Sequence, residues 1–406
     1  MPYETVFRAP LEIADGQATI SWLNNDKGFQ LDGRNIDVKA KAVHARGGFR
    51  YLQPANDEPW LGILAGISTD DGSQAWRYFP ENLMGKDLVD YLSGAIQGGE
   101  ADNATLVYGG NPQLFPYKHN EGQFEVLVPL RNAKFAFQPD WPALTNLDIE
   151  LDFINDGLWM KTDGVNLGGV RASNLTAVLP DYSKEKLLID ADIKGPGKAV
   201  GPYFDETPLK DSLGATLQEL QLDGDVNARL HLDIPLNGEL VTAKGEVTLR
   251  NNSLFIKPLD STLKNLSGKF SFINGDLQSE PLTASWFNQP LNVDFSTKEG
   301  AKAYQVAVNL NGNWQPAKTG FLPAAVNEAL SGSVAWDGKV GIELPYHAGA
   351  TYNVELNGDL KNVSSHLPSP LAKPAGEPLP VNVKVDGNLN SFELTGQAGA
   401  DNHFNS

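Results

Sequence analysis

The side chains that could act as acids, bases or metal ligands are scattered along this chain of 406 residues. The six histidines have no neighbour at the spacing of a metal site; they are His44, His119, His231, His347, His366 and His403. There is no cysteine, which excludes disulfides, cysteine-type zinc sites and thiol catalysis. We interpret the histidines as solvated side chains and expect neither a metal site nor a cofactor.

A run of carboxylates in the segment "DIELDF" could bind a metal or supply a general acid. Asp148, Glu150 and Asp152 alternate with leucine and isoleucine, however, so all three point to one face of a strand. We interpret them as the solvated face of a sheet. Two glycine-containing segments also fail as sites: "STDDGSQ" lacks the spaced acids of a calcium loop, and "GPGKAVG" misses the dinucleotide fingerprint by one residue. With no GxSxG and no HExxH motif, we expect no catalytic residue and no enzyme activity.

The dominant pattern is an apolar residue at every second position, which is typical of strands with one apolar face. Asp, Glu, Lys, Asn, Gln and Ser fill the positions between. The sequence therefore predicts a mainly β, antiparallel fold. Its expected apolar face comprises Leu147, Ile149, Leu151, Phe153, Leu230, Leu232, Ile234, Leu249, Phe270, Phe272, Leu291, Val293, Phe295, Val306, Val308, Leu310, Val340, Ile342, Leu344, Val354, Leu356, Val381, Val383 and Val385.

Asn-Gly and Asp-Gly pairs predict tight turns between the strands, because both accept positive φ angles. They occur at Ile273–Asp276, Leu310–Asn313, Trp336–Lys339, Leu356–Asp359 and Val385–Asn388. Helical spacing predicts short helices in Pro80–Gln97, Thr207–Leu220 and Phe321–Gly332, and the glycine-rich segment Lys194–Pro202 reads as a loop. The eight tryptophans are expected to pack in the core or at its rim, with sugar stacking as the alternative.

The chain repeats itself at a long interval. Shifting the sequence by 119 residues aligns Val128–Leu158 with Val247–Leu277 without a gap, and 12 of the 31 positions are identical. Average residue usage would give roughly two. We expect residues 1–406 to form one continuous elongated β-groove with internal repeats at approximately 80–205, 206–320 and 321–406.

Composition narrows the choice of partners. The net charge of −18 argues against nucleic acid and against an anionic membrane surface. The chain has no apolar stretch long enough to span a membrane and no signal peptide, and it starts and stops in strand-like sequence. We interpret it as a segment of something longer, with Met1 added for expression.

The apolar faces of so many strands must be shielded from water, and three short helices are too few to shield them all. The strands could pair as tandem β-sandwiches, close into barrels, or curl into a trough. A trough wider than its own side chains can fill would hold acyl chains. The sandwich alternative predicts a filled core and a non-catalytic structural or ligand-binding module, of adhesin or sugar-binding type.

The succession of units such as "LKNLSGKFSFINGDL" (Leu263–Leu277) and "LTASWFNQPLNVDF" (Leu282–Phe295) resembles the AsmA-like family and its relative TamB. The likeness extends over essentially the whole chain, including "YFPENLMGKDLVDYLSGAIQGGEADNATLVYGG", and is closest to an internal segment of one very long member. It implies a bridge-like lipid transfer protein, anchored in the inner membrane of a Gram-negative bacterium and extending across the periplasm. Its curled, U-shaped β-groove would shield phospholipid acyl chains on their way to the outer membrane.

The resemblance supplies no catalytic residues. It implies that the alternating apolar positions above line the lipid groove, and that docking to either membrane depends on parts absent from these 406 residues. A charge introduced at Leu151 or Phe272 is expected to block lipid passage and leave the fold largely intact.

Overall fold

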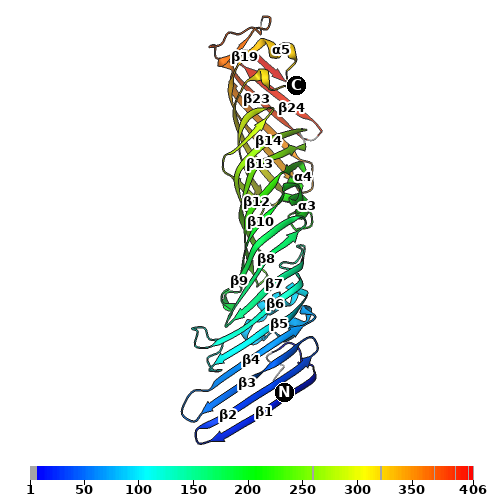
Figure 1. Ribbon diagram of the computed structural model, residues 1–406. Coiled ribbons are helices and arrows are strands. Elements are labelled where there is room, and N and C mark those ends of the chain that lie inside the picture. Colours follow the sequence, from blue (N-terminus) through cyan, green and yellow to red (C-terminus); the bar gives the residue numbers. More distant parts are fainter. Residues whose placement is uncertain are drawn as a thin grey trace. The chain divides into compact units, whose positions relative to one another are not determined.

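The computed structural model describes residues 7–257, 260–320, 322–369, 371–388, 390–400 and 402–405. Twenty-three of its strands belong to one sheet, and every pairing that can be followed residue by residue is antiparallel. Two further strands form a small sheet of their own. The predicted mainly β class, with antiparallel strands and a few short helices, is confirmed (Figure 1). One long sheet is consistent with a curled groove and differs from the paired sheets of tandem sandwiches.

The strands are mostly 9 to 15 residues long, which suits the long alternating runs of the sequence. They are β1 (Ile13–Asn25), β2 (Gly28–Ala40), β3 (His44–Pro54), β4 (Trp60–Thr69), β5 (Ile96–Gly110), β6 (Gln123–Phe135), β7 (Leu144–Ile154), β8 (Gly157–Leu167), β9 (Val170–Leu179), β10 (Lys186–Pro196), β11 (Leu220–Asp223), β12 (Asp225–Pro235), β13 (Thr242–Ile256), β14 (Ser261–Ile273), β15 (Asp276–Ser279), β16 (Leu282–Trp286), β17 (Gln289–Glu299), β18 (Ala303–Trp314), β19 (Leu330–Gly332), β20 (Val334–Pro345), β21 (Thr351–Asp359), β22 (Val363–Ser365), β23 (Pro380–Asn388), β24 (Phe392–Ala398) and β25 (Asn402–Asn405).

The helical segments are all short. The α-helices are α1 (Glu81–Met84), α2 (Lys86–Ala95), α3 (Val200–Phe204), α4 (Ala215–Glu219) and α5 (Ala324–Ala329). The 3-10 helices are η2 (Gly72–Tyr78), η3 (Tyr182–Lys184), η4 (Gly197–Ala199), η7 (Pro316–Lys318) and η8 (Leu360–Asn362), and η5 (Lys210–Gly214) is a π-helix.

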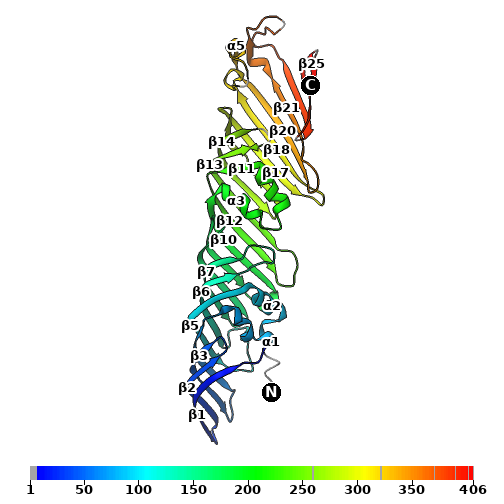
Figure 2. The same ribbon diagram turned by 90° about the vertical axis from the view of Figure 1, so that its right-hand side faces the viewer.

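The chain divides into two compact units. Of the residues described, the first takes those in Met1–Leu167, Arg171–Asp192 and Leu230–Thr242, and the second takes the rest. The first unit therefore holds β1 to β8, η2, α1 and α2. The second holds α3, α4, α5, nearly all of β13, and the strands from β14 onward. Figure 2 shows α1 and α2 on one side of the first unit's strands.

The 119-residue repeat has a structural counterpart in the backbone. Among the asparagines of the first unit that adopt positive φ angles are Asn132 (47°), Asn146 (51°) and Asn155 (51°). Three more do so 119 positions later in the second unit, at Asn251 (54°), Asn265 (54°) and Asn274 (52°). The first two asparagines of each set accompany irregularities in the ladders β6–β7 and β13–β14, and the third starts the following hairpin. The boundaries of the three proposed repeats stay a prediction.

The third asparagine of each set also closes the same pair of hydrogen bonds. The Asn155 side chain accepts from the backbone N–H of Phe124 at 2.9 Å, and its own N–H donates to the Phe124 carbonyl at 2.8 Å. Asn274 makes the same two bonds with Ala243, at 2.8 and 2.7 Å. The repeat thus conserves a turn that fixes the start of one strand against the next.

Four of the five predicted Asn-Gly or Asp-Gly turns are wrong. Only Ile273–Asp276 forms a hairpin turn, between β14 and β15; the other pairs lie inside β18, β20, β21 and β23. Their glycines make room for large neighbours. A Cβ on Gly312 would lie 2.8 Å from Nε1 of Trp314, and one on Gly338 would lie 2.6 Å from Cδ2 of Leu356. A tight turn and the close approach of a neighbouring side chain both favour glycine. The local sequence therefore does not distinguish a turn glycine from one inside a strand.

All three predicted stretches contain helices, but the bounds and types of these helices differ from the prediction. Gly85, with φ of 82°, divides the first stretch into α1 and α2, and Ile96 already begins β5. The second stretch contains η5 and α4, and the third contains α5 followed by β19; Phe321 lies outside the described residues. The segment Lys194–Pro202, predicted as a loop, ends β10 and then forms η4 and the start of α3. Pro202 is tolerated there because it lies in the first turn of the helix.

We predict that Asn274→Ala destabilises the protein by about 2 kcal/mol, since it removes a hydrogen bond to the backbone and puts alanine at a positive φ that asparagine adopts more readily. Asn274→Gly should cost about half as much, because glycine accepts that φ. Urea unfolding followed by circular dichroism measures both values. Asn309→Ala, at an exposed position of β18, is the control. Equal losses for the alanine and glycine variants would contradict the backbone argument.

Candidate functional site

Cross-strand register places the predicted apolar residues of the second unit on one face. Residues directly opposite each other in an antiparallel pair point to the same side of the sheet. One continuous ladder crosses β17, β18, β20, β21, β23 and β24 and consists of Phe295, Val308, Val340, Val354, Val385 and Leu394. A second ladder of directly opposite residues, next to the first on the same face, runs through Val293, Leu310, Gly338, Leu356, Val383 and Gly396. We call this side the apolar face.

The burial of the apolar face changes along the second unit. Near β13 to β18 its residues form a buried cluster that includes Leu249, Leu263, Leu282, Leu291 and Val293. Along β20, β21 and β23 the apolar residues are only half-buried. The apolar face is therefore filled at one part of the unit and partly open to solvent at another.

Three tryptophans of the second unit pack at the edge of this cluster. The rings of Trp314 and Trp336 have their centroids 4.7 Å apart, and those of Trp286 and Trp314 are 6.2 Å apart. The indole N–H of Trp286 donates to the Ser261 hydroxyl, and that of Trp314 donates to the Pro290 carbonyl, each at 2.7 Å. These three rings match the predicted packing role.

In the first unit, helices cover part of the apolar face. The ladder β5–β6–β7 places Leu106, Val126 and Phe153 on one side. The ring of Phe79, between η2 and α1, lies 6.2 Å from that of Phe153, and Leu92 of α2 is fully buried. The helical segment therefore packs on the apolar face and closes it over β7.

Toward β1 the apolar face of the first unit is uncovered. The ladder from β1 to β5 consists of Ile20, Gly33, Phe49, Ile63 and Tyr108. Ile20 is 47% exposed and Trp22, on the same face, is 71% exposed. The apolar residues predicted from the sequence do not include this stretch, although "ATISWL" carries the alternation. Glycines and charged residues in the adjoining strands interrupt the pattern there.

None of the 24 predicted apolar residues is exposed. Nine are buried within the protein: Leu147, Ile149, Leu151, Phe153, Ile234, Leu249, Leu291, Val293 and Val306. Fifteen are half-buried: Leu230, Leu232, Phe270, Phe272, Phe295, Val308, Leu310, Val340, Ile342, Leu344, Val354, Leu356, Val381, Val383 and Val385. Their role in lining a lipid groove stays a prediction.

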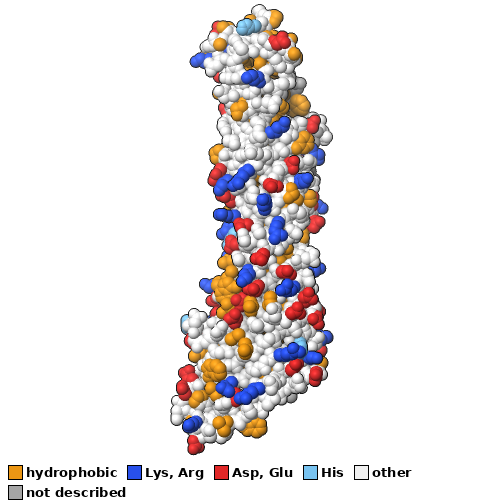
Figure 3. All heavy atoms as spheres, viewed as in Figure 1, with side chains coloured by type: hydrophobic (Ala, Val, Ile, Leu, Met, Phe, Trp, Pro, Cys, Tyr) orange, Lys and Arg blue, Asp and Glu red, His pale blue; other side chains and the backbone are white. Residues whose placement is uncertain are grey.

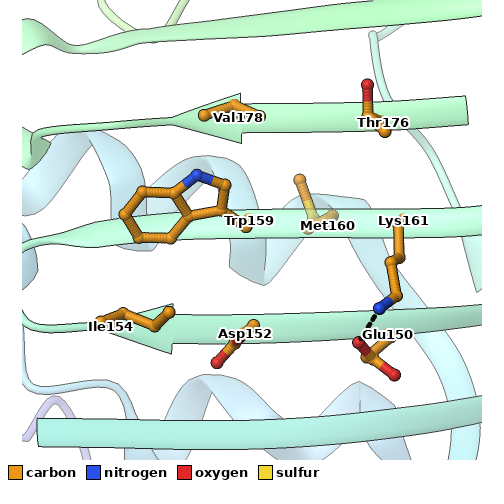
Figure 4. A pocket seen from close by; sticks show the side chains of 8 residues that line it. All are labelled: Glu150, Asp152, Ile154, Trp159, Met160, Lys161, Thr176 and Val178. Atoms are coloured by element: carbon orange, nitrogen blue, oxygen red, sulfur yellow. Dashed lines mark ion pairs between the residues drawn. The ribbon is translucent and has the colours of Figure 1, made fainter.

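The carboxylates of "DIELDF" lie on the opposite, polar face. Two of them, Glu150 and Asp152, border a depression of about 370 Å³ over β7, β8 and β9, which Figure 4 shows from close by. Glu150 pairs with Lys161 at 2.7 Å. Asp152 is half-buried below Trp159, and its Oδ1 has no hydrogen-bond partner among the described residues. Burial, reinforced by the neighbouring charges of Glu125 and Glu150, raises the pKa of Asp152.

No group of three or more acidic or histidine side chains in the described part of the chain could hold a metal ion. Two histidines instead lie beside aspartates: His44 is 2.7 Å from Asp37, and His231 is 2.8 Å from Asp190 and 3.4 Å from Asp233. Among the described helices, none has the length and apolar character needed to cross a membrane.

We predict that Asp152→Asn stabilises the protein at pH 7. The raised pKa means that the folded state holds this proton more tightly, so stability falls as the pH rises from the ordinary carboxyl pKa of about 4 through the raised value. The gain should therefore vanish at about pH 3, where the carboxyl is protonated in both states. Thermal melts at the two pH values measure it, with Asp163→Asn at an exposed position of β8 as the control. A gain of equal size at both pH values would contradict the assignment.

Burial changes one expectation about charge substitutions. Leu151 is 2% exposed, so Leu151→Asp should destabilise the fold by roughly 3–5 kcal/mol instead of leaving it intact. Val385→Asp, at a half-buried position, should cost no more than about 2 kcal/mol. Chemical denaturation compares the two variants. Similar losses at both positions would mean that the apolar face is equally closed over β7 and β23.

The comparisons with known proteins cover the whole chain. A family model described as "YhdP protein" matches residues 1–406. A curated relative from Escherichia coli (strain K12), "Intermembrane phospholipid transporter YhdP", is 98% identical over 406 residues, which are 100% of this chain and 32% of the relative. The chain thus spans about a third of that relative's length. No solved structure matches it. The resemblance to an internal segment of YhdP is confirmed, and the chain belongs to the YhdP family.

Proposed function

We propose that this chain is a bridge-like lipid transfer segment whose apolar face shields phospholipid acyl chains during transport between two membranes. The observation that carries the proposal is the unbroken apolar ladder from Phe295 to Leu394, which stays half-buried across five strand pairings. The printed function of the relative, intermembrane phospholipid transport, supports the same cargo. The proposed setting is the periplasm of a Gram-negative bacterium, with the inner and outer membranes engaged through other parts of the full-length protein.

The energetics suit a cargo of acyl chains. Each methylene moved from water to an apolar surface gains about 0.8 kcal/mol. The ladder offers valine, leucine and phenylalanine at successive strands, so neighbouring positions present similar surfaces. A tail would find similar binding free energy at each step and could slide without a deep trap. The charged head group would remain in water.

The role requires no chemical step, so we propose that the segment acts without catalysis. The fifteen half-buried residues are the proposed tail contacts. The nine buried ones would form the floor on which those contacts rest, since their side chains already pack within the protein. Where Phe79 packs against Phe153 of β7, the apolar face is occupied by the protein's own helical segment.

Native mass spectrometry of the purified chain, with lipid extraction from the same sample, tests the proposal. We expect co-purified phospholipid, and we expect the double variant Val354→Asp/Val385→Asp to lose most of it. Asn353→Asp adds a charge on the opposite face of β21 and should retain the lipid. Bare protein in the wild-type sample, or equal lipid in the double variant and the control, would overturn the proposal.

A further inference from the structure

The polar face of the first unit carries a second depression, separate from the acidic one. It has a volume of about 690 Å³ and lies over β2, β3, β4 and β5. Figure 3 shows basic and apolar side chains next to one another over this region. Phe49 and Ile63 of the apolar face also border the depression, but register places its arginines, Trp60 and Leu64 on the opposite, polar face.

Glycines form the floor. On this side β3 presents Gly48 between two arginines, and β4 presents Gly62 and Gly66 on either side of Leu64. A Cβ on Gly66 would meet nothing within 4 Å, and the ring of Trp60 lies across Gly62. Glycine inside a strand weakens it and often marks a place where a ligand approaches the backbone. The bare backbone between larger side chains creates the hollow.

Arginines form one wall. Arg34, Arg46 and Arg50 line the depression together with one carboxylate, Asp32, which leaves a balance of two positive charges in a chain of net charge −18. Asp32 is 6% exposed and already accepts hydrogen bonds from Arg50 and Gln30, each at 2.6 Å.

The other two arginines keep donors available. The nearest contact between Arg34 and Asp32 is 3.9 Å, and the Arg34 side chain is 65% exposed. Arg46 pairs through Nε with Asp37 at 3.1 Å, and its side chain is 69% exposed. Both guanidinium groups can therefore donate to a further anion from solvent.

The facing wall is apolar and exposed. Leu64 is 65% exposed and Trp60 is 42% exposed, although both are large side chains on the polar side of the sheet. A cationic wall beside an exposed apolar wall matches a ligand with an anionic head and an apolar tail.

We propose that this depression binds the phosphate-bearing head group of an anionic amphiphile, with Arg34 and Arg46 on the phosphate and Trp60 and Leu64 against the first part of the tail. Guanidinium groups donate to phosphate oxygens in pairs, and a phosphate offers enough acceptors for two arginines at once. This site is independent of the acyl-chain role above, because the four side chains that would hold the ligand lie on the other face of the sheet.

The test follows the indole N–H signal of Trp60 in two-dimensional NMR spectra of the 15N-labelled protein, assigned with Trp60→Phe. The probe is dihexanoyl phosphatidylglycerol below its micelle concentration. We expect saturable shifts, an affinity about tenfold lower for dihexanoyl phosphatidylcholine, and a similar drop for glycerol phosphate, which lacks the tail. Glycerol phosphate binding as tightly as the lipid would make this a site for free phosphate and overturn the amphiphile assignment.

Matched variants distinguish loss of ligand contacts in the depression from loss of the fold. Arg34→Gln/Arg46→Gln should weaken binding about tenfold and keep the fold, because both side chains are largely exposed. Gly66→Val should also weaken it by filling the floor. Arg131→Gln, an exposed arginine of β6, is the control and should leave the affinity unchanged.

Three further results would overturn the inference: equal affinity for the two lipids, unchanged affinity in the double arginine variant, or tighter binding of a hexaglutamate peptide than of phosphatidylglycerol. The variant Val354→Asp/Val385→Asp should not alter the Trp60 shift. The two proposals can therefore fail separately.

Discussion

The structure depends on strict two-residue alternation held in direct cross-strand register. Because a slip of one residue would turn every side chain of a strand to the other face, each pairing must be fixed. The second unit keeps Val340, Val354 and Val385 opposite one another over successive strands. Burial of the apolar side chains stabilises this register. Where the ladders β6–β7 and β13–β14 are irregular, positive-φ asparagines that recur 119 residues apart fix the pairing.

Whether other parts of the protein pack on the apolar face determines whether that face is a core or a surface open to ligands. Where the helical segment around Phe79 packs on β7, residues such as Leu147 and Leu151 reach 0% and 2% exposure and behave as an ordinary core. Along β20, β21 and β23 the same kind of ladder remains half-buried. One sequence pattern therefore produces both a structural core and a surface able to accept apolar ligands.

The polar face is not uniform either. It carries an acidic depression around Asp152 and a basic one around Arg34, and each has a tryptophan at its edge. In both, the ring lies across a glycine: Trp159 over Gly157 and Trp60 over Gly62. Glycine inside a strand thus has one physical effect in several places, since the missing Cβ lets a neighbouring large side chain lie flat on the sheet.

The sequence by itself determined the β class and most residues of the apolar face, because alternation with period two is a property of each strand alone. The succession of its motifs pointed to the family. It also located the three helical regions, although Gly85 and Ile96 show that their ends depend on context. The tertiary structure decided which glycines turn and which lie under a ring. It also decided which apolar residues are covered and which cationic side chains meet across strands. These outcomes depend on contacts between residues far apart in the chain, such as Phe79 with Phe153, and local spacing carries no information about them.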